Sequence, residues 1–308
     1  MRHVLWLVLC AGCVTVPPPR AGFDVALTVD DLPLHGPLSA ERPPLDIAER
    51  FIAVLRAHGV RGVYGFTNGS RVEPGTEPVL TAWVKAGHHL SNHTWSHGSL
   101  NRLSAEEFLA DASQNEQLLA KYEPDATARL FFRYPFLFEG DTLEKREAVR
   151  RGLFERGFKL AHVSIDADDW AFNPPFVRCL KAGEREKVAE LRKLFIATHL
   201  DEWERMRALS KSLTQRDDVP QVLLLHLGAG DAEFLDELLT AFEQRGARWV
   251  SLDRALADPF YGIDPALAQK SGAAFPYRVA KARAVSVDAP IYARGLEERL
   301  ETFCEGAE

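Results

Sequence analysis

The chain has 308 residues, of which 46% are hydrophobic and 26% charged, and its formal net charge at pH 7 is -7. This length and composition are typical of a globular protein with a full hydrophobic core, and they exclude a disordered chain. The basic residues are scattered singly and form no runs, so the sequence lacks the basic patch that binds nucleic acid. We therefore expect no nucleic-acid partner.

The first residues have the features of an export signal. A basic start precedes an apolar stretch from Val4 to Leu9, which is too short to span a bilayer, and the small residues before Cys13 resemble a bacterial lipobox. We expect residues 1–22 to form a signal peptide or lipoprotein leader with a proline-rich tether, and the protein to be exported to the cell envelope, periplasm or extracellular space. A lipid anchor at Cys13 is the expected membrane contact, with plain secretion or an uncleaved apolar N-terminus as alternatives.

From Asp24 onward, short apolar runs alternate with longer helical patterns, which is typical of repeated βα units. The predicted strands are residues 25–29, 63–67, 89–92, 130–133, 160–165, 222–225 and 249–252. Between them, Ile47, Phe51 and Leu55 fall on one helical face, and Ser104 with Glu107 predicts a capping box at the start of a second helix. Seven strands of this kind predict an α/β fold, a distorted (β/α)7 barrel.

The barrel domain is expected to cover residues 23–256. Residues 183–215 are rich in Glu, Lys, Arg and Leu, and they predict a helical insertion at about 176–219, ahead of the sixth strand. Residues 257–308 form a C-terminal extension that ends in a short amphipathic helix. Of the four cysteines, two lie in the leader, and the sequence leaves open whether Cys179 and Cys304 pair.

Polar motifs follow five of the predicted strands, at the end where the side chains of a βα barrel converge. They are Asp30-Asp31, His93-x-x-x-His97, Arg133-Tyr134-Pro135-Phe136, Asp166 to Trp170, and Leu224-Leu225-His226. One carboxylate with two imidazoles suits a divalent metal, and a second carboxylate beside them is free to act as a base. Each motif alone is often a turn, a surface pair or ordinary core. Their order after successive strands indicates a metal-assisted hydrolase.

In this order, the motifs resemble those of the polysaccharide deacetylases, the NodB-homology group of carbohydrate esterase family 4. That family carries Thr-Phe-Asp-Asp, His-Ser/Thr-x-x-His, Arg-x-Pro-Tyr/Phe, Asp-x-x-Asp-Trp and Leu-x-His. The resemblance implies a NodB-type barrel and the metal-dependent hydrolytic deacetylation of N-acetylated, or O-acetylated, sugars. The expected substrate is an envelope or extracellular polysaccharide, either peptidoglycan or a chitin-like chain. Val29 replaces the family's aromatic residue, a change expected to affect packing and not chemistry.

The resemblance also implies which residues hold the metal and which one acts as the base. Asp31, His93 and His97 are expected to bind Zn²⁺, although other divalent metals remain open. Asp30, kept off the metal, is expected to be the general base. Arg133 would hold Asp30 in its ionised form and orient it.

The remaining implied roles concern the leaving group and the substrate. His226 is the expected general acid, and Asp169 would favour its charged form and fix its ring. The backbone N–H of Phe136 is expected to stabilise the oxyanion together with the metal. The expected substrate contacts are Trp170, Leu224 and Tyr134.

Three alternatives stay open. Relatives of the family hydrolyse other small amides or imides on the same fold. Two histidines and one carboxylate also form a facial triad for Fe²⁺, which is disfavoured because the adjoining base, arginine and acid form a proton-transfer set that oxygen chemistry does not require. A non-catalytic carbohydrate-binding protein is expected to lack one of the catalytic residues, but all are present. His35 could contact the substrate, but we expect it to be an ordinary loop histidine.

Overall fold

The computed structural model describes residues 22–38, 42–127, 129–287 and 295–305. The expected leader and Cys13 lie outside these ranges. No helix within the described ranges is both long enough and apolar enough to cross a membrane.

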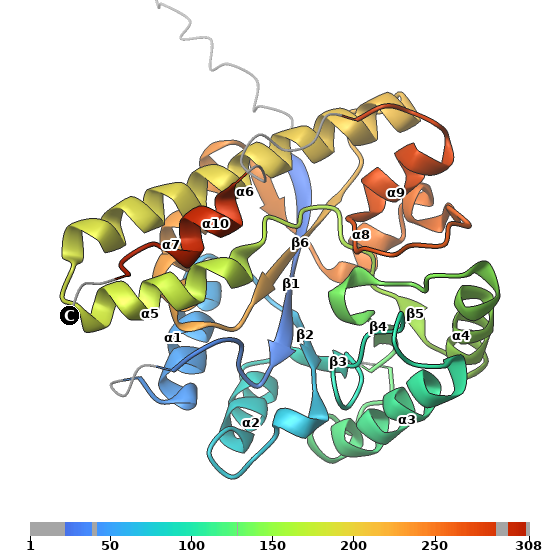
Figure 1. The fold of residues 1–308 in the computed structure, drawn as a ribbon, viewed down its shortest axis with the longest axis horizontal. Helices are drawn as coiled ribbons and strands as arrows, with labels where there is room; N and C mark the ends of the chain where they lie inside the picture. The colour runs from blue at the N-terminus through green and yellow to red at the C-terminus, as the bar shows by residue number, and fades with distance from the viewer. Residues whose placement is uncertain (1–21, 39–41, 128, 288–294, 306–308) are drawn as a thin grey trace, which may run out of the picture.

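Parallel strands form the centre of the described part of the chain (Figure 1). They are β1 (Phe23–Leu32), β2 (Tyr64–Thr67), β3 (His89–Asn92), β4 (Phe131–Phe132), β5 (Lys159–Leu160), β6 (Gln221–His226) and β7 (Ala247–Trp249). The order across the sheet is β5-β4-β3-β2-β1-β6, and β7 pairs with the first residues of β1. Beyond β5, Ile165 forms a parallel bridge to Leu223 of β6, so the sheet curls back on itself. The predicted distorted barrel is confirmed.

Helices surround the curled sheet (Figure 1). They are α1 (Pro44–Ala57), α2 (Glu77–Lys85), α3 (Ala105–Tyr122), α4 (Leu143–Glu155), α5 (Asn173–Lys181), α6 (Arg185–Thr214), α7 (Ala229–Gln244), α8 (Leu252–Leu256), α9 (Phe275–Ala282) and α10 (Leu296–Glu301). The predicted apolar stripe of α1 is buried, and the predicted capping box is present at the start of α3, where Ser104 and Glu107 each accept from the other's backbone N–H.

The predicted last strand is partly wrong. The prediction placed residues 249–252 in a strand, but β7 ends at Trp249 and α8 begins at Leu252. The cause is local, because the Ser251 side chain accepts a hydrogen bond from the Arg254 N–H and caps the new helix.

The helical region ahead of β6 consists of α5 and the 30-residue α6, which pack on each other and on α7. Leu191, Phe195 and Trp203 of α6 are fully buried, so this long helix adds to the core and does not project from it. A disulfide between Cys179 of α5 and Cys304, just after α10, answers the question that the sequence left open. It joins the end of the chain to the helical region.

Candidate active site

A cavity of about 340 Å³ opens at the carboxyl ends of the strands. It is lined by residues near the ends of β1 and β6, by residues that follow β1, β3 and β4, by residues between β5 and α5, and by one glycine of the C-terminal extension. The lining residues are Asp30, Asp31, His35, His93, His97, Phe136, Leu137, Asp166, Asp168, Trp170, Leu224, His226 and Gly272. Parallel strands bring their ends to one face, which explains why residues so distant in sequence meet here.

The two consecutive aspartates reach the same cavity because β1 is irregular at its end. In a regular strand, neighbouring side chains point to opposite faces. Here Asp31 has a left-handed φ of 61°, and the pairing of β1 with β2 shifts register between Val29 and Leu32. Asp30 still pairs in register with His226 of β6. The irregularity therefore turns Asp31 toward the side on which Asp30 already lies.

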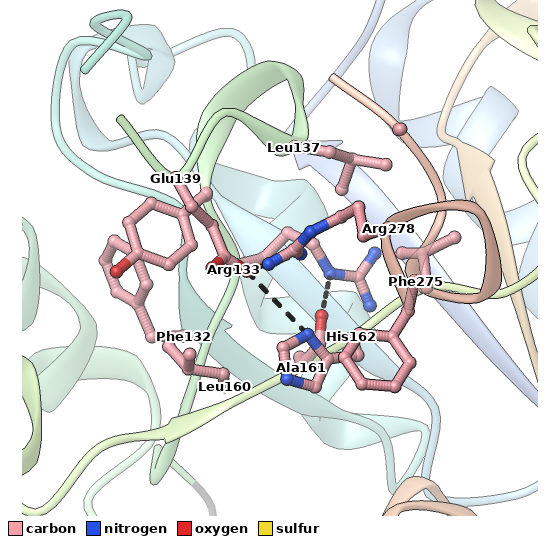
Figure 2. Close-up of a pocket in the computed structure, with 12 residues that line it drawn as sticks. Phe132, Arg133, Leu137, Glu139, Leu160, Ala161, His162, Phe275 and Arg278 are labelled. Atoms are coloured by element: carbon pink, nitrogen blue, oxygen red, sulfur yellow. Dashed lines mark hydrogen bonds and ion pairs between the residues drawn. The ribbon is translucent and has the colours of Figure 1, made fainter. Parts of the chain in front are cut away.

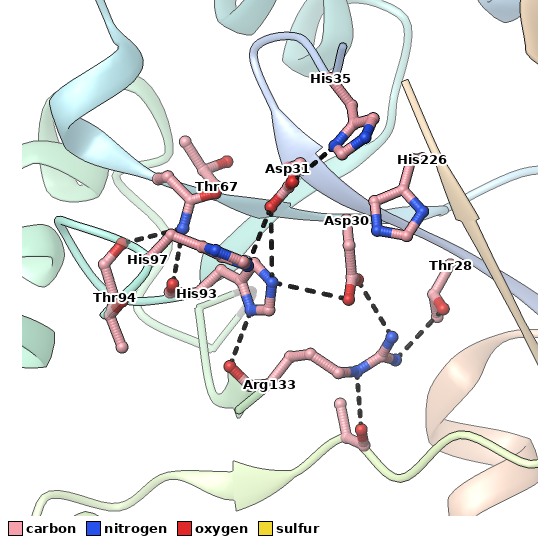
Figure 3. Close-up of polar contacts among 12 residues, drawn as sticks. Thr28, Asp30, Asp31, His35, Thr67, His93, Thr94, His97, Arg133 and His226 are labelled. Carbon is pink, nitrogen blue, oxygen red and sulfur yellow. Dashed lines mark hydrogen bonds and ion pairs between the residues drawn. The ribbon is translucent and has the colours of Figure 1, made fainter. Parts of the chain in front are cut away.

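Asp31, His93 and His97 form a cluster with the geometry of a metal site (Figure 3). Asp31 Oδ1 lies 3.3 Å from His97 Nε2 and 3.6 Å from His93 Nε2. This oxygen is buried and has no hydrogen-bond partner, which is costly unless a cation occupies the space that it faces. His93 Nδ1 contacts the Arg133 carbonyl oxygen at 2.8 Å, an arrangement that leaves Nε2 as a lone-pair donor.

The charge states of the cluster also suit a divalent cation. Burial lowers the pKa of His97 to about 4 and lowers the pKa of His93 well below its usual value, so both imidazoles are neutral. Burial raises the pKa of Asp31, but the hydrogen bond from His35 and the nearby histidines outweigh it and hold that pKa well below the usual range. Two neutral imidazoles and one carboxylate fit a divalent metal of the zinc type, with positions left open for other ligands.

Asp30 lies beside this cluster and is held by Arg133. Arg133 Nη1 donates to Asp30 Oδ1 at 3.0 Å, while its other nitrogens donate to the carbonyl oxygen of Ala161 and to Thr28 Oγ1. Both Asp30 and Arg133 are almost fully buried. Burial raises the pKa of Asp30 to about 6, and the charge of Arg133 limits the rise. A carboxyl group with such a pKa can accept a proton near neutral pH.

On the neighbouring strand β6, His226 is fixed by Asp169. The ring Nδ1 of His226 contacts Asp169 Oδ1 at 2.9 Å, and its backbone N–H donates to Asp169 Oδ2 at 2.6 Å. Burial lowers the pKa of His226, but the charge and hydrogen bond of Asp169 outweigh burial and raise it to about 10. The pairing with Asp169 therefore favours the imidazolium, and because Nδ1 faces Asp169, Nε2 is the ring nitrogen able to give up a proton.

The other expected site residues divide into two groups. Phe136, Trp170 and Leu224 line the cavity, and the side chains of Phe136 and Trp170 are 51% and 38% exposed. Tyr134 is not among the lining residues, because its ring is buried and stacks on Phe108. Its placement therefore does not support the expected substrate contact.

Two side chains that the sequence analysis did not assign to the site also contact Asp31. His35 Nδ1 lies 2.7 Å from Asp31 Oδ2, and Arg71 Nη1 lies 3.0 Å from the same oxygen. The ring of His35 also packs against His226, with centroids 4.8 Å apart. The position of His35, only four residues after Asp31, could have indicated from the sequence that it belongs to the site. Arg71 follows β2 in a short 3-10 helix, and no motif marked it.

The sequence matches one family model and several curated proteins. Residues 19–151 match the family model for polysaccharide deacetylase. The chain is 27% identical over 155 residues to the peptidoglycan-N-acetylglucosamine deacetylase of Bacillus cereus, covering 49% of this chain and 48% of that protein. It is 24% identical over 237 residues to a chitin deacetylase of Arthroderma benhamiae, covering 76% of this chain and 52% of that protein. The chain thus spans about half the length of these curated relatives.

The fold also has solved counterparts. The chitin deacetylase of Colletotrichum lindemuthianum superposes with a TM-score of 0.52 at 20% identity, covering 77% of this chain and 88% of that one. A CE4 family pseudoenzyme from Bacillus anthracis superposes with a TM-score of 0.51 at 15% identity, covering 78% and 67%. At these identities the likeness concerns the fold alone. The family-model match and the fold together confirm that this chain resembles the polysaccharide deacetylases, the NodB-homology group of carbohydrate esterase family 4.

Proposed function

We propose that this protein is a metal-dependent hydrolase that removes acetyl groups from N-acetylated sugars of an envelope or extracellular polysaccharide. The single observation that carries the proposal is the meeting of three groups in one cavity. These are the Asp31-His93-His97 cluster, Asp30 and His226, all of which line the cavity. Arg133 and Asp169 lie outside the lining and hold Asp30 and His226. Amide hydrolysis needs a polarised carbonyl, a base and an acid, and these three groups can supply them.

We propose Zn²⁺ as the resident metal, held by Asp31, His93 and His97. When bound, a divalent cation of this kind polarises a carbonyl oxygen and lowers the pKa of water. Asp30 is then the base that takes a proton from the attacking water, with Arg133 orienting its carboxylate. His226 carries the proton that the departing amine needs, and Asp169 keeps the imidazole charged until that transfer.

The walls of the cavity would orient the acetylated sugar. The backbone N–H of Phe136 is the proposed donor to the oxygen on which negative charge develops. Trp170 and Leu224 provide apolar surface for the acetyl methyl group. Peptidoglycan is the preferred substrate because the expected leader, residues 1–22, would take the protein to the envelope, where a lipid anchor at Cys13 would hold it. Chitin-like chains are the next candidates, and the curated relatives bear both names.

The test is acetate release by zinc-loaded protein from acetylated peptidoglycan, chitin oligomers and acetylxylan. We expect release from at least one N-acetylated glycan. Asp30→Asn should reduce turnover by at least about 10²-fold while leaving zinc bound, because this change removes the base and no metal ligand. His97→Ala should weaken both turnover and zinc binding. Wild-type turnover in Asp30→Asn would show that the base is assigned incorrectly.

A second candidate is a carbohydrate-binding protein without catalysis. One structural counterpart is described as a pseudoenzyme, so the fold alone does not guarantee turnover. The proposed base and acid, Asp30 and His226, are both present in the cavity here, which favours the enzyme. Glycan binding without acetate release, at full zinc occupancy, would favour the binding protein instead.

A further inference from the structure

The C-terminal extension contributes directly to the active-site face. Its residues 264–278, called the strap below, run across the loops that follow three strands. The Lys270 carbonyl oxygen accepts from Asn101 Nδ2 at 3.2 Å, the Gln269 N–H donates to the Gly140 carbonyl oxygen at 2.7 Å, and the Phe275 N–H donates to the Val163 carbonyl oxygen at 2.6 Å. The strap is thus fixed to segments after β3, β4 and β5 by contacts that depend mainly on its backbone.

The strap reaches the site at Gly272. This glycine lines the active-site cavity, and a Cβ added to it would lie 1.9 Å from the Phe136 carbonyl oxygen. Because that neighbour is backbone and not the end of a flexible side chain, any side chain at position 272 would have to displace either the strap or the loop. The strap therefore lies in direct contact with the peptide that follows the proposed oxyanion donor.

A buried ion pair fixes the same loop a few residues further on. Arg278 Nη1 lies 2.5 Å from Glu139 Oε1, and both side chains are almost fully buried. Figure 2 shows Glu139, Leu137, Arg278 and Phe275 around a small cavity of about 20 Å³. Burial raises the pKa of Glu139, but Arg278, His162 and Arg146 outweigh it and keep the carboxylate ionised.

The loop held in this way has a strained backbone. Phe136 and Leu137 have φ values of 56° and 54°, a left-handed conformation that is unfavourable for residues other than glycine. Two such residues in succession persist only where the surroundings determine the conformation. The surroundings here are the strap contacts at Gly272 and the Arg278–Glu139 pair.

We propose that the strap is a positioning element for the Phe136 loop, with Gly272 and Arg278 as its positioning residues. It holds the loop so that the Phe136 N–H points at the developing negative charge. This inference rests on the proposed function and deepens it, because it assigns a role in that site to residues outside the barrel. The strap would stabilise the transition state more than the bound substrate. Disrupting its contacts with the Phe136 loop should therefore lower kcat with little change in KM.

The first experiment compares Gly272→Ala with Gly262→Ala. Gly262 lies in the same extension, and a Cβ there would meet no atom within 4 Å. We expect Gly272→Ala to lower kcat by about tenfold or more, with KM and zinc affinity near wild type, because the proposed oxyanion donor is displaced. Gly262→Ala should match the wild type in all three quantities. Equal kcat values for the two variants would overturn the proposal.

The second experiment measures the loop without using activity. Hydrogen exchange of the backbone amides of residues 136–140 should be faster in Arg278→Gln than in Arg283→Gln, a control at an exposed arginine just after α9. Unchanged exchange in Arg278→Gln would overturn the strap proposal, whatever the enzyme does. A wild-type protein that releases no acetate but shows the exchange difference would instead overturn only the proposed function.

Discussion

The two carboxylate oxygens of Asp31 have different surroundings. Oδ2 is in contact with His35 and Arg71, whereas Oδ1 is buried without a hydrogen-bond partner and faces the two histidines of the cluster. The donors therefore fix the carboxylate through one oxygen and leave the other for a cation. In metal sites, partners of this kind orient the ligand and contribute to affinity.

The first prediction concerns His35. We expect His35→Ala to weaken zinc binding by about 10- to 100-fold, since the carboxylate of Asp31 loses a partner that fixes it. Competition with a chromogenic chelator measures the affinity. His58→Ala is the matched control, because His58 is paired with Glu243 and Asp236 on α7, away from the site. An unchanged zinc affinity in His35→Ala would mean that Arg71 alone holds the carboxylate.

The second prediction concerns the pH dependence of turnover. The pKa of His226 is raised to about 10, so the acid form is present below that pH and is lost as the pH rises through it. The pKa of Asp30 is about 6, so the base form is lost as the pH falls through that value. Asp169→Asn removes the charge that raises the pKa of His226. The alkaline limb of the kcat profile should therefore move to lower pH, while the acidic limb stays nearly in place. An unmoved alkaline limb would exclude His226 as the group that sets it.

Among the elements, β1 and β6 were predictable because each is a short apolar run that ends in a polar motif. β3 lies at the predicted residues, β1 extends the predicted strand by two residues at its start and three at its end, and β6 extends it by one residue at each end. Such runs are buried on both faces, so their composition alone marks them. β4 and β5 are shorter than predicted, because the chain after each leaves the sheet early to form site loops.

The extension beyond residue 256 was a candidate for shaping the substrate groove, but the contacts of the strap were not predictable from the sequence. Its contacts are made largely by backbone groups, and backbone groups leave no pattern of residue types. Gly272 and Arg278 carry no periodic signal, and their partners Phe136 and Glu139 are far away in sequence. Tyr134 illustrates the same limit, since the motif gave its position but not the direction of its ring, which packs into the core.

The third prediction concerns the disulfide between α5 and the end of the chain. Cys304→Ser should lower the free energy of unfolding by about 2–4 kcal/mol, because the unfolded chain loses a cross-link. Urea denaturation without reductant measures the change. Reductant should lower the stability of the wild type toward that of Cys304→Ser and leave the variant unchanged. A wild type insensitive to reductant, with the thiols shown to be free, would contradict this account.

At the scale of the whole molecule, the metal ligands come from two separate parts of the fold, the end of β1 and the loop after β3. The unfolded chain does not hold them together, so a metal that binds only the native state should stabilise it. The fourth prediction is a rise in melting temperature with zinc, corresponding to about 2.7 kcal/mol when free zinc is a hundredfold above Kd. Asp31→Asn should show a much smaller rise in a thermal melt, and an equal rise would place the zinc elsewhere.

The candidate site was largely predictable at this scale, and for a physical reason. Parallel strands joined by helices bring their carboxyl ends together, so polar motifs after successive strands converge whatever their distance in sequence. The order of the motifs therefore gave most of the residues that line the cavity, but not His35, Leu137 or Gly272. It could not give Arg71, which follows β2 without a recognisable motif, or the left-handed turn at Asp31 that brings the two carboxylates to one side.

The central position of β1 has a consequence for synthesis of the chain. Thr28 of β1 is hydrogen-bonded to Leu223, 195 residues later, so the strand with both aspartates lacks one neighbour until β6 is made. At ordinary translation speeds of about 5–20 residues per second, that delay is roughly 10–40 s. During this interval one edge of β1 is open to wrong partners, and the barrel cannot close before most of the polypeptide has left the ribosome.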